Sequence, residues 1–153
     1  SYGKTTFRCE CAILSAGSVL AGDNATGQVF AFTPGIYADD GAVITYLASV
    51  WIAHADRPVR FNNLVLQGAR GVGLATGQGS DPVTEMRYSN DQGNTWSTWR
   101  QATLGKVGEY TRRAVWQQLG LIREPGRLIE IRTTDPVLAT MAGVLINQAR
   151  PHG

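Results

Sequence analysis

Short stretches of the chain alternate between apolar and polar residues, and glycine, asparagine or aspartate separates one stretch from the next. A period of two with such interruptions is typical of β-strands joined by turns. Val19–Ala21 leads through the turn 22–27 into Val29–Phe32, which predicts a hairpin. The turn signal 39–41 precedes Val43–Ile52, the longest β-branched and aromatic stretch. Further strands are predicted over Arg60–Gln67, Glu85–Tyr88, Trp96–Gln101, Ala114–Leu121, Arg127–Thr133 and Ala139–Ile146.

No window of the sequence keeps a helical period for long, although a short turn of helix is predicted near Lys106–Thr111. The segment Gly68–Pro82 holds five glycines in fifteen residues, which predicts a long, open loop. A length of 153 residues is typical of one domain and is enough to bury a core. The chain is therefore expected to be all-β and antiparallel, with a single β domain over residues 1–153.

The composition indicates a globular and weakly charged protein, with 43% hydrophobic and 17% charged residues. The net charge of +2 is too small to predict nucleic-acid binding by itself. Residues 84–153 hold nine Lys/Arg against six Asp/Glu, so the positive charge lies in the second part of the chain. No apolar run approaches the roughly 20 residues that a membrane-spanning helix needs, and no membrane span is expected.

The two cysteines, Cys9 and Cys11, stand so close together that a disulfide between them would be strained. Free thiols are expected, and with them a reducing compartment at the time of folding. A zinc site would need two further ligands, but His54 and His152 stand in no ligand spacing. The segment Gly71–Gly77 is only superficially similar to a nucleotide-binding loop, because no helix start follows it. The sequence therefore predicts neither a metal nor a cofactor.

The segment Ser89–Trp96, SNDQGNTW, has the spacing S-x-D-x-G-x-T-W. It resembles the Asp-box, a turn found in sialidases and in many β-propeller proteins. Asp91 is placed to accept hydrogen bonds from N–H groups of the turn, and Gly93 supplies a φ that other residues adopt at a cost. Trp96 is expected to enter the next strand and bury its ring. A structural turn, rather than a sugar-binding or catalytic loop, accounts for all five positions: Ser89, Asp91, Gly93, Thr95 and Trp96.

The sequence contains no coherent catalytic set to accompany this turn. A sialidase would need several Asp-boxes, three arginines on the sugar carboxylate and a Tyr–Glu pair. Glu109 and Tyr110 are adjacent, so in a strand they would face opposite sides and could not act together. No Ser-His-Asp set has a plausible spacing, and neither histidine has an orienting partner. An enzyme is therefore not expected.

The order of motifs along the chain is more specific than any one motif. The segments are AGDNATGQVFAF, YADDGAVI, GVG, QGSDP, MRYSNDQGNTWS, LGKVGEYTRR, VWQQLG and TDPV. This series resembles the C-terminal part of the packaged-DNA stabilisation proteins, the tail hub or nozzle proteins of short-tailed bacteriophages. The similarity runs from about Val19 to Asn147 and corresponds to the last third or so of a usual family member.

The resemblance implies a virion protein of the phage tail, assembled in the bacterial cytoplasm as a six-fold homo-oligomeric ring. It implies as partners a portal-side adaptor, tail needle or tip proteins, and packaged double-stranded DNA that passes through the lumen. It also implies propeller-like β-blades. A compact β-sandwich is the alternative fold, because a propeller of few blades cannot close. The alternative function is a glycan- or receptor-binding β domain of a virion.

Five arginines are candidates for lumen or subunit contacts, with a solvated strand face as the alternative for each: Arg112, Arg113, Arg123, Arg127 and Arg132. The first three are expected to form one basic patch. The acidic turns at Asp23 and Asp39–Asp40 are expected to form its complement on the next subunit.

Tryptophan exposure separates the structural hypothesis from the glycan-binding hypothesis. Trp99 stands three residues after Trp96, so in a strand the two rings would lie on opposite faces. One of these faces is expected to be wet, and an exposed ring could stack on a sugar. Core packing is the alternative for the four tryptophans, which are Trp51, Trp96, Trp99 and Trp116.

Overall fold

The computed structural model describes residues 9–33, 38–39, 42–43, 46–52 and 58–146. Contacts within the chain form two compact units, Ser1–Ile36 and Tyr37–Gly153, which are described separately. All regular elements in the described ranges are β-strands, and every paired strand runs antiparallel to its neighbour. The all-β antiparallel class is therefore confirmed, whereas the single β domain over residues 1–153 stays a prediction.

The first unit is a three-stranded sheet with the order β1-β2-β3, formed by Cys9–Ser15, Ser18–Asp23 and Val29–Phe32. Ala16 and Gly17 both have positive φ, which is the geometry of a tight two-residue hairpin turn between β1 and β2. Between β2 and β3, the Asp23 carboxylate accepts hydrogen bonds from the Ala25 N–H (2.8 Å) and the Thr26 hydroxyl (2.6 Å). The hairpin predicted from the sequence is thus confirmed.

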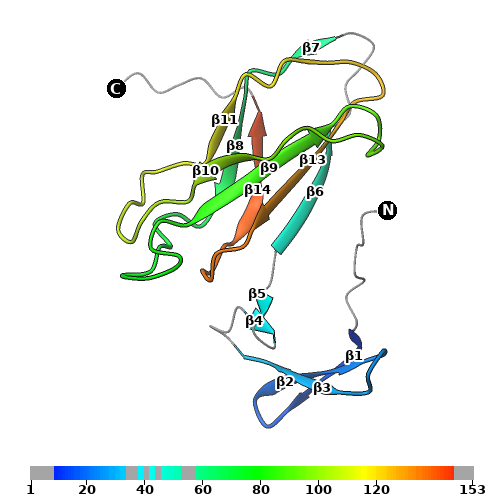
Figure 1. Ribbon diagram of the computed structural model, residues 1–153, viewed down its shortest axis with the longest axis vertical. Coiled ribbons are helices and arrows are strands. Elements are labelled where there is room, and N and C mark those ends of the chain that lie inside the picture. Colours follow the sequence, from blue (N-terminus) through cyan, green and yellow to red (C-terminus); the bar gives the residue numbers. More distant parts are fainter. Residues whose placement is uncertain (1–8, 34–37, 40–41, 44–45, 53–57, 147–153) are drawn as a thin grey trace. The chain divides into compact units, whose positions relative to one another are not determined.

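The second unit contains two main sheets (Figure 1). The larger sheet has the order β10-β9-β13-β6, formed by Arg100–Thr103, Val83–Ser89, Arg127–Thr133 and Tyr46–Ile52. The smaller sheet has the order β11-β8-β14, formed by Val115–Gln117, Asn63–Gly68 and Met141–Ile146. Two short pairs are β12 (Leu121–Ile122) with β7 (Val59–Arg60), and β4 (Ala38–Asp39) with β5 (Ala42–Val43). Residues 40–41 of the predicted turn 39–41 lie outside the described residues.

Alternation along the strands places the core between the two sheets. In β13, Ile129 and Ile131 are buried in one cluster with Met86 of β9 and with Leu64 and Leu66 of β8. Residues directly opposite each other in an antiparallel pair share a face, so the outward residues of β9 and β13 form a second, polar face. The result is a two-layer β-sandwich.

One edge of the sandwich is closed by hydrogen bonds between the layers. The Trp116 indole N–H of β11 donates to the Arg100 carbonyl of β10 (2.7 Å), and the Arg100 guanidinium donates to the Gln117 carbonyl (2.6 Å). Trp116 is buried, so its single donor needs this partner. These contacts place β10 and β11 side by side.

Three local predictions were wrong in detail. The predicted strand Trp96–Gln101 begins only at Arg100, although the Ser97 N–H still donates to the Tyr88 carbonyl of β9 (2.9 Å). The predicted strand Ala114–Leu121 divides into β11 and β12, because Gln118 and Gly120 have positive φ. Lys106–Thr111 forms no helix and instead makes two successive turns, Glu109 N–H to the Lys106 carbonyl and Arg112 N–H to the Glu109 carbonyl.

The glycine-rich segment 69–82 contains no strand, as predicted for a long loop, but it is open only at residues 74–78 and 81, and its other residues pack against their neighbours. The Gly71 N–H donates to the Leu104 carbonyl (3.0 Å), and the Gly73 N–H donates to the Gly105 carbonyl (3.3 Å). A Cβ at Gly73 would lie 2.8 Å from the Ser80 carbonyl oxygen and 2.9 Å from Lys106 Cα. Glycine is therefore required by close packing of segments 69–82 and 104–114, which are called the end loops below.

We expect Gly73→Ala to lower the free energy of unfolding by about 1–3 kcal/mol, because the added methyl group has no space and backbone must move. Gly143→Ala is the matched control, since a Cβ at Gly143 meets nothing within 4 Å and its φ is not positive. Urea unfolding of both variants measures the difference. Equal stability of the two variants would contradict the close packing of the end loops.

Candidate functional site

The turn after β9 is built around Asp91. Its carboxylate accepts hydrogen bonds from the Thr95 hydroxyl (2.6 Å), the Ser89 hydroxyl (2.7 Å) and the Thr95 N–H (2.8 Å). The Ser89 hydroxyl oxygen in turn accepts from the Gly93 N–H (2.8 Å). Gly93 has a φ of +95°, in the left-handed region that favours glycine. These groups satisfy one another within the turn, so the carboxylate acts as a structural acceptor.

The same hydrogen bonds hold Asp91 in its ionised form. Donation from the Thr95 and Ser89 hydroxyls and from the Thr95 N–H lowers the pKa of Asp91 from 3.8 to about 2. A folded-state pKa below the unfolded value means that the turn gains stability above pH 3.8 and loses it as the pH falls through about 2.

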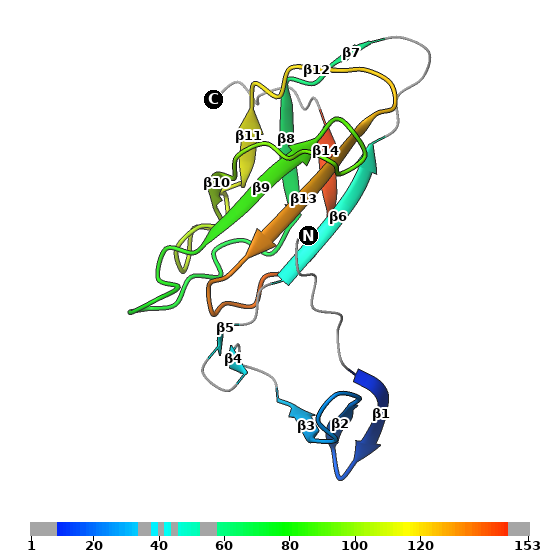
Figure 2. The ribbon, with the colours of Figure 1, turned by 45° about the vertical axis from the view of Figure 1, so that its right-hand side comes forward.

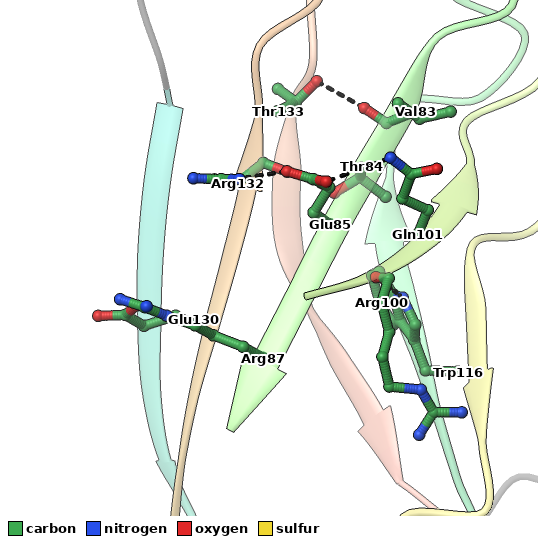
Figure 3. Close-up of polar contacts among 10 residues, drawn as sticks. All are labelled: Val83, Thr84, Glu85, Arg87, Arg100, Gln101, Trp116, Glu130, Arg132 and Thr133. Carbon is green, nitrogen blue, oxygen red and sulfur yellow. Dashed lines mark hydrogen bonds and ion pairs between the residues drawn. The ribbon is translucent and has the colours of Figure 1, made fainter. Parts of the chain in front are cut away.

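The outer face of the larger sheet carries two ion pairs directly across the β9–β13 ladder. Arg87 is opposite Glu130, and its Nε donates to Glu130 Oε2 at 2.6 Å. Arg132 is opposite Glu85, and its Nε donates to Glu85 Oε2 at 2.7 Å. Figure 3 shows Glu85 between Arg132 and Gln101, whose side-chain amide donates to it. The charges of these residues are therefore satisfied within the sheet.

Two tryptophan rings lie against the guanidinium groups of these pairs. The Arg87 Cζ atom lies 4.4 Å from the Trp96 ring centroid and 4.6 Å from that of Trp99. The Arg132 Cζ atom lies 3.9 Å from the Trp99 centroid. Both tryptophans are half-buried and share Arg87, so the prediction that they lie on opposite strand faces was wrong. Trp99 stacks on arginine and does not offer an open platform for a sugar.

Arg127 was a candidate for a lumen or subunit contact, but it is only 2% exposed. Its guanidinium donates to the side-chain carbonyl of Asn90 and to the backbone carbonyls of Leu119 and Leu121. It also lies over the Tyr88 ring, with Cζ 4.1 Å from the centroid. Burial lowers the pKa of Arg127. This side chain fastens the segment between β11 and β12 to the larger sheet and cannot reach a partner.

The exposed arginines do not form the single patch that the sequence predicts. Arg112 and Arg113 are exposed in the end loop 104–114, which follows β10 and lies at the Thr133 end of β13. Arg123 is exposed in the turn that leads into the other end of β13. The two segments lie at opposite ends of the sandwich (Figure 2). Arg132 lies between these ends on the sheet face, where Glu85 pairs with it.

The expected acidic complement is also changed by the structure. Asp23 is buried and closes the β2–β3 turn through its own hydrogen bonds, so it does not present an exposed charge. The side chains of Asp39 and Asp40 lie outside the described residues. In the end loops, Glu109 accepts a hydrogen bond from the Lys106 N–H at 3.0 Å, and Tyr110 is exposed.

Within the described ranges, no three His, Cys, Asp or Glu side chains are grouped so that they could hold a metal ion. Cys9 and Cys11 are free thiols, as predicted. His54 and His152 lie outside the described residues. In the part of the chain that the structure describes, no helix has the length and hydropathy needed to cross a membrane.

Together, the layered sheets and the internally paired charges define a β-sandwich structural domain. Residues 45–149, about two thirds of the chain, match the protein family described as Bacteriophage P22 Gp10, beta-sandwich. The chain therefore belongs to this family and is a bacteriophage structural protein. The match confirms the predicted family, and of the two predicted architectures it names the β-sandwich. No curated protein matches the chain.

We expect Asp91→Asn to lower the melting temperature at neutral pH, because the amide cannot accept all the hydrogen bonds that the carboxylate accepts. The difference from wild type should shrink as the pH falls from 3.8 to about 2, where the carboxylate itself becomes protonated. Thermal unfolding of both proteins across this pH range measures the difference in melting temperature. Asp81→Asn, which neutralises an exposed carboxylate, is the control for net charge. A difference that is independent of pH would contradict the role of the charged form.

Proposed function

We propose that this chain is part of a phage tail hub or nozzle, which stabilises packaged DNA and forms part of the conduit for its ejection. The match of residues 45–149 to the Bacteriophage P22 Gp10 sandwich carries the proposal. The order of motifs from Val19 to Asn147 supports the finer assignment to the tail. In this proposal the subunits form a six-fold ring between a portal-side adaptor and the needle or tip.

The charge distribution is suited to such a conduit. Arg87, Arg127 and Arg132 are engaged inside the domain, so their charges are withheld from DNA. Among the described residues, the exposed cations are Arg60, Lys106, Arg112, Arg113 and Arg123. A wall with many phosphate contacts would bind DNA tightly and slow its passage, because each contact adds to affinity. Arg112 and Arg113 remain exposed on end loops that are fixed by close packing. They are the side chains that we assign to the DNA or to the neighbouring subunit.

Imaging of intact phage particles tests the position of the chain. We expect density for the sandwich to repeat around the tail axis below the portal. Density on a single peripheral fibre, with none around the axis, would contradict the hub and favour the alternative, a glycan- or receptor-binding domain.

Charge reversal tests the role that we assign to the end loops. We expect particles that carry Arg112→Glu and Arg113→Glu together to retain packaged DNA less well, or to assemble fewer complete tails, than wild-type particles. Arg123→Glu, an exposed arginine at the other end of the sandwich, is the matched control. Equal DNA retention and tail assembly in all three kinds of particle would contradict a role for Arg112 and Arg113.

A further inference from the structure

As far as the described strands extend, the two layers of the sandwich differ in width, which leaves one side open. With β10 and β11 side by side at one edge, the strand orders β10-β9-β13-β6 and β11-β8-β14 give the larger sheet one strand more. Among the described strands, β6 pairs only with β13, and β14 pairs only with β8. A fourth position next to β14, beneath β6, is therefore unfilled by the described chain.

Residues that should be covered by such a strand are exposed. Val50 is opposite Ile129 and shares its core-facing side, yet Val50 is 36% exposed whereas Ile129 is buried. Ile146 is opposite the buried Leu64 and is 40% exposed. At the other edge, Trp116 is buried on the same core-facing side. In the part of the chain that the structure describes, the interior of the sandwich is thus closed at the β10–β11 edge and open at the β6–β14 edge.

The described strand edges at the open side carry little protection against pairing apart from a register shift between Met141 and Gly143 in β14. Edge strands of soluble proteins usually contain lysine, proline or inward-pointing charges that prevent association with other chains. The strands β6, YLASVWI, and β14, MAGVLI, contain none of these residues. An uncharged strand edge above an exposed apolar surface is suited to the addition of a further β-strand.

The first unit offers a strand of matching chemistry. In β3, VFAF, no residue is charged, and among the described strands β3 pairs only with β2. Val29 and Ala31 share one face of this sheet with Ile13 and Leu20, and Val29 is 68% exposed. A three-stranded sheet with an uncovered apolar face needs packing against another element for stability.

We propose that β3 of one copy adds to the free edge of β14 in a second copy and covers Val50 with Val29 and Ala31. The donated strand β3 and the receiving edge of β14 are different surfaces, so the contact is heterologous. Heterologous contacts close into rings when the rotation between copies allows it. The ring itself rests on the proposed function, whereas the pairing of β3 with β14 is a separate claim about this chain.

Two complementary variants test this pairing. Val29→Asp disables the donated strand, and Val50→Asp disables the receiving side, because docking would bury an unpaired carboxylate. Each variant alone should associate more weakly than wild type by roughly a hundredfold or more. An equal mixture should form dimers and nothing larger, since the intact strand of one variant fits the intact receiving side of the other. Sedimentation velocity over a concentration series measures the masses.

Leu138→Asp is the matched control, because Leu138 is an exposed apolar residue outside both surfaces and its change should leave association unaltered. Cooperative thermal unfolding verifies that each variant is folded, and Ile146→Asp replaces Val50→Asp if the latter unfolds.

Wild type that stays monomeric at every concentration, or a mixture that forms no dimers, would overturn the proposal. Association of Val29→Asp alone as strongly as wild type would instead indicate pairing of receiving sides and would overturn it too. Particles that lack density around the tail axis, with the dimers formed as expected, would reject the hub and leave the pairing intact.

Discussion

The buried ion pair between Arg87 and Glu130 is the interaction on which the outer layer of the sandwich depends. Glu130 is 1% exposed, and Arg87 Nε and Nη2 both contact its Oε2 atom, at 2.6 and 2.5 Å. Removing two charges from water is costly unless close geometry compensates for it. Here Trp96 and Trp99 cover the guanidinium, so residues 96–99 are fixed on the sheet by the same pair.

This arrangement decides which parts of the molecule are available to partners. On the outer face of the larger sheet, the charges of β9 and β13 are paired and the rings of Trp96 and Trp99 stack on arginine, whereas Trp51 of β6 is 45% exposed. Among the described residues, the exposed cations lie instead at the two ends of the sandwich, in the end loops and in the segments around β7 and β12. The exposed apolar residues Val50 of β6 and Ile146 of β14 lie along one side. A structural domain of this kind has its ends and edges available for contacts, which agrees with the family to which the chain belongs.

The sequence could predict strands but not which charges are covered. The alternation of apolar and polar residues predicted the strand Arg127–Thr133 with the correct bounds. This is possible because the sheet face on which a side chain lies depends only on its position along the strand. The same pattern could not show that Arg127 is buried, because the oxygens that accept its hydrogen bonds belong to Asn90, Leu119 and Leu121, which lie elsewhere in the sequence. The Arg87–Glu130 pair was missed, although a signal exists. Glu85 and Arg87 in one strand, and Glu130 and Arg132 in another, have the same order of charge along the chain, so antiparallel pairing sets each arginine opposite a glutamate.

A double-mutant cycle on Arg87 and Glu130 measures how strongly the two buried charges stabilise each other. Arg87→Met or Glu130→Gln alone should lower the free energy of unfolding by about 3–5 kcal/mol, because the remaining charge stays buried without its partner. The double variant should lose about 2–3 kcal/mol less than the sum of the two single losses. The same cycle on the more exposed pair Arg132 and Glu85 should give a coupling below about 1 kcal/mol. Single losses that add within about 0.5 kcal/mol for Arg87 and Glu130 would contradict the account.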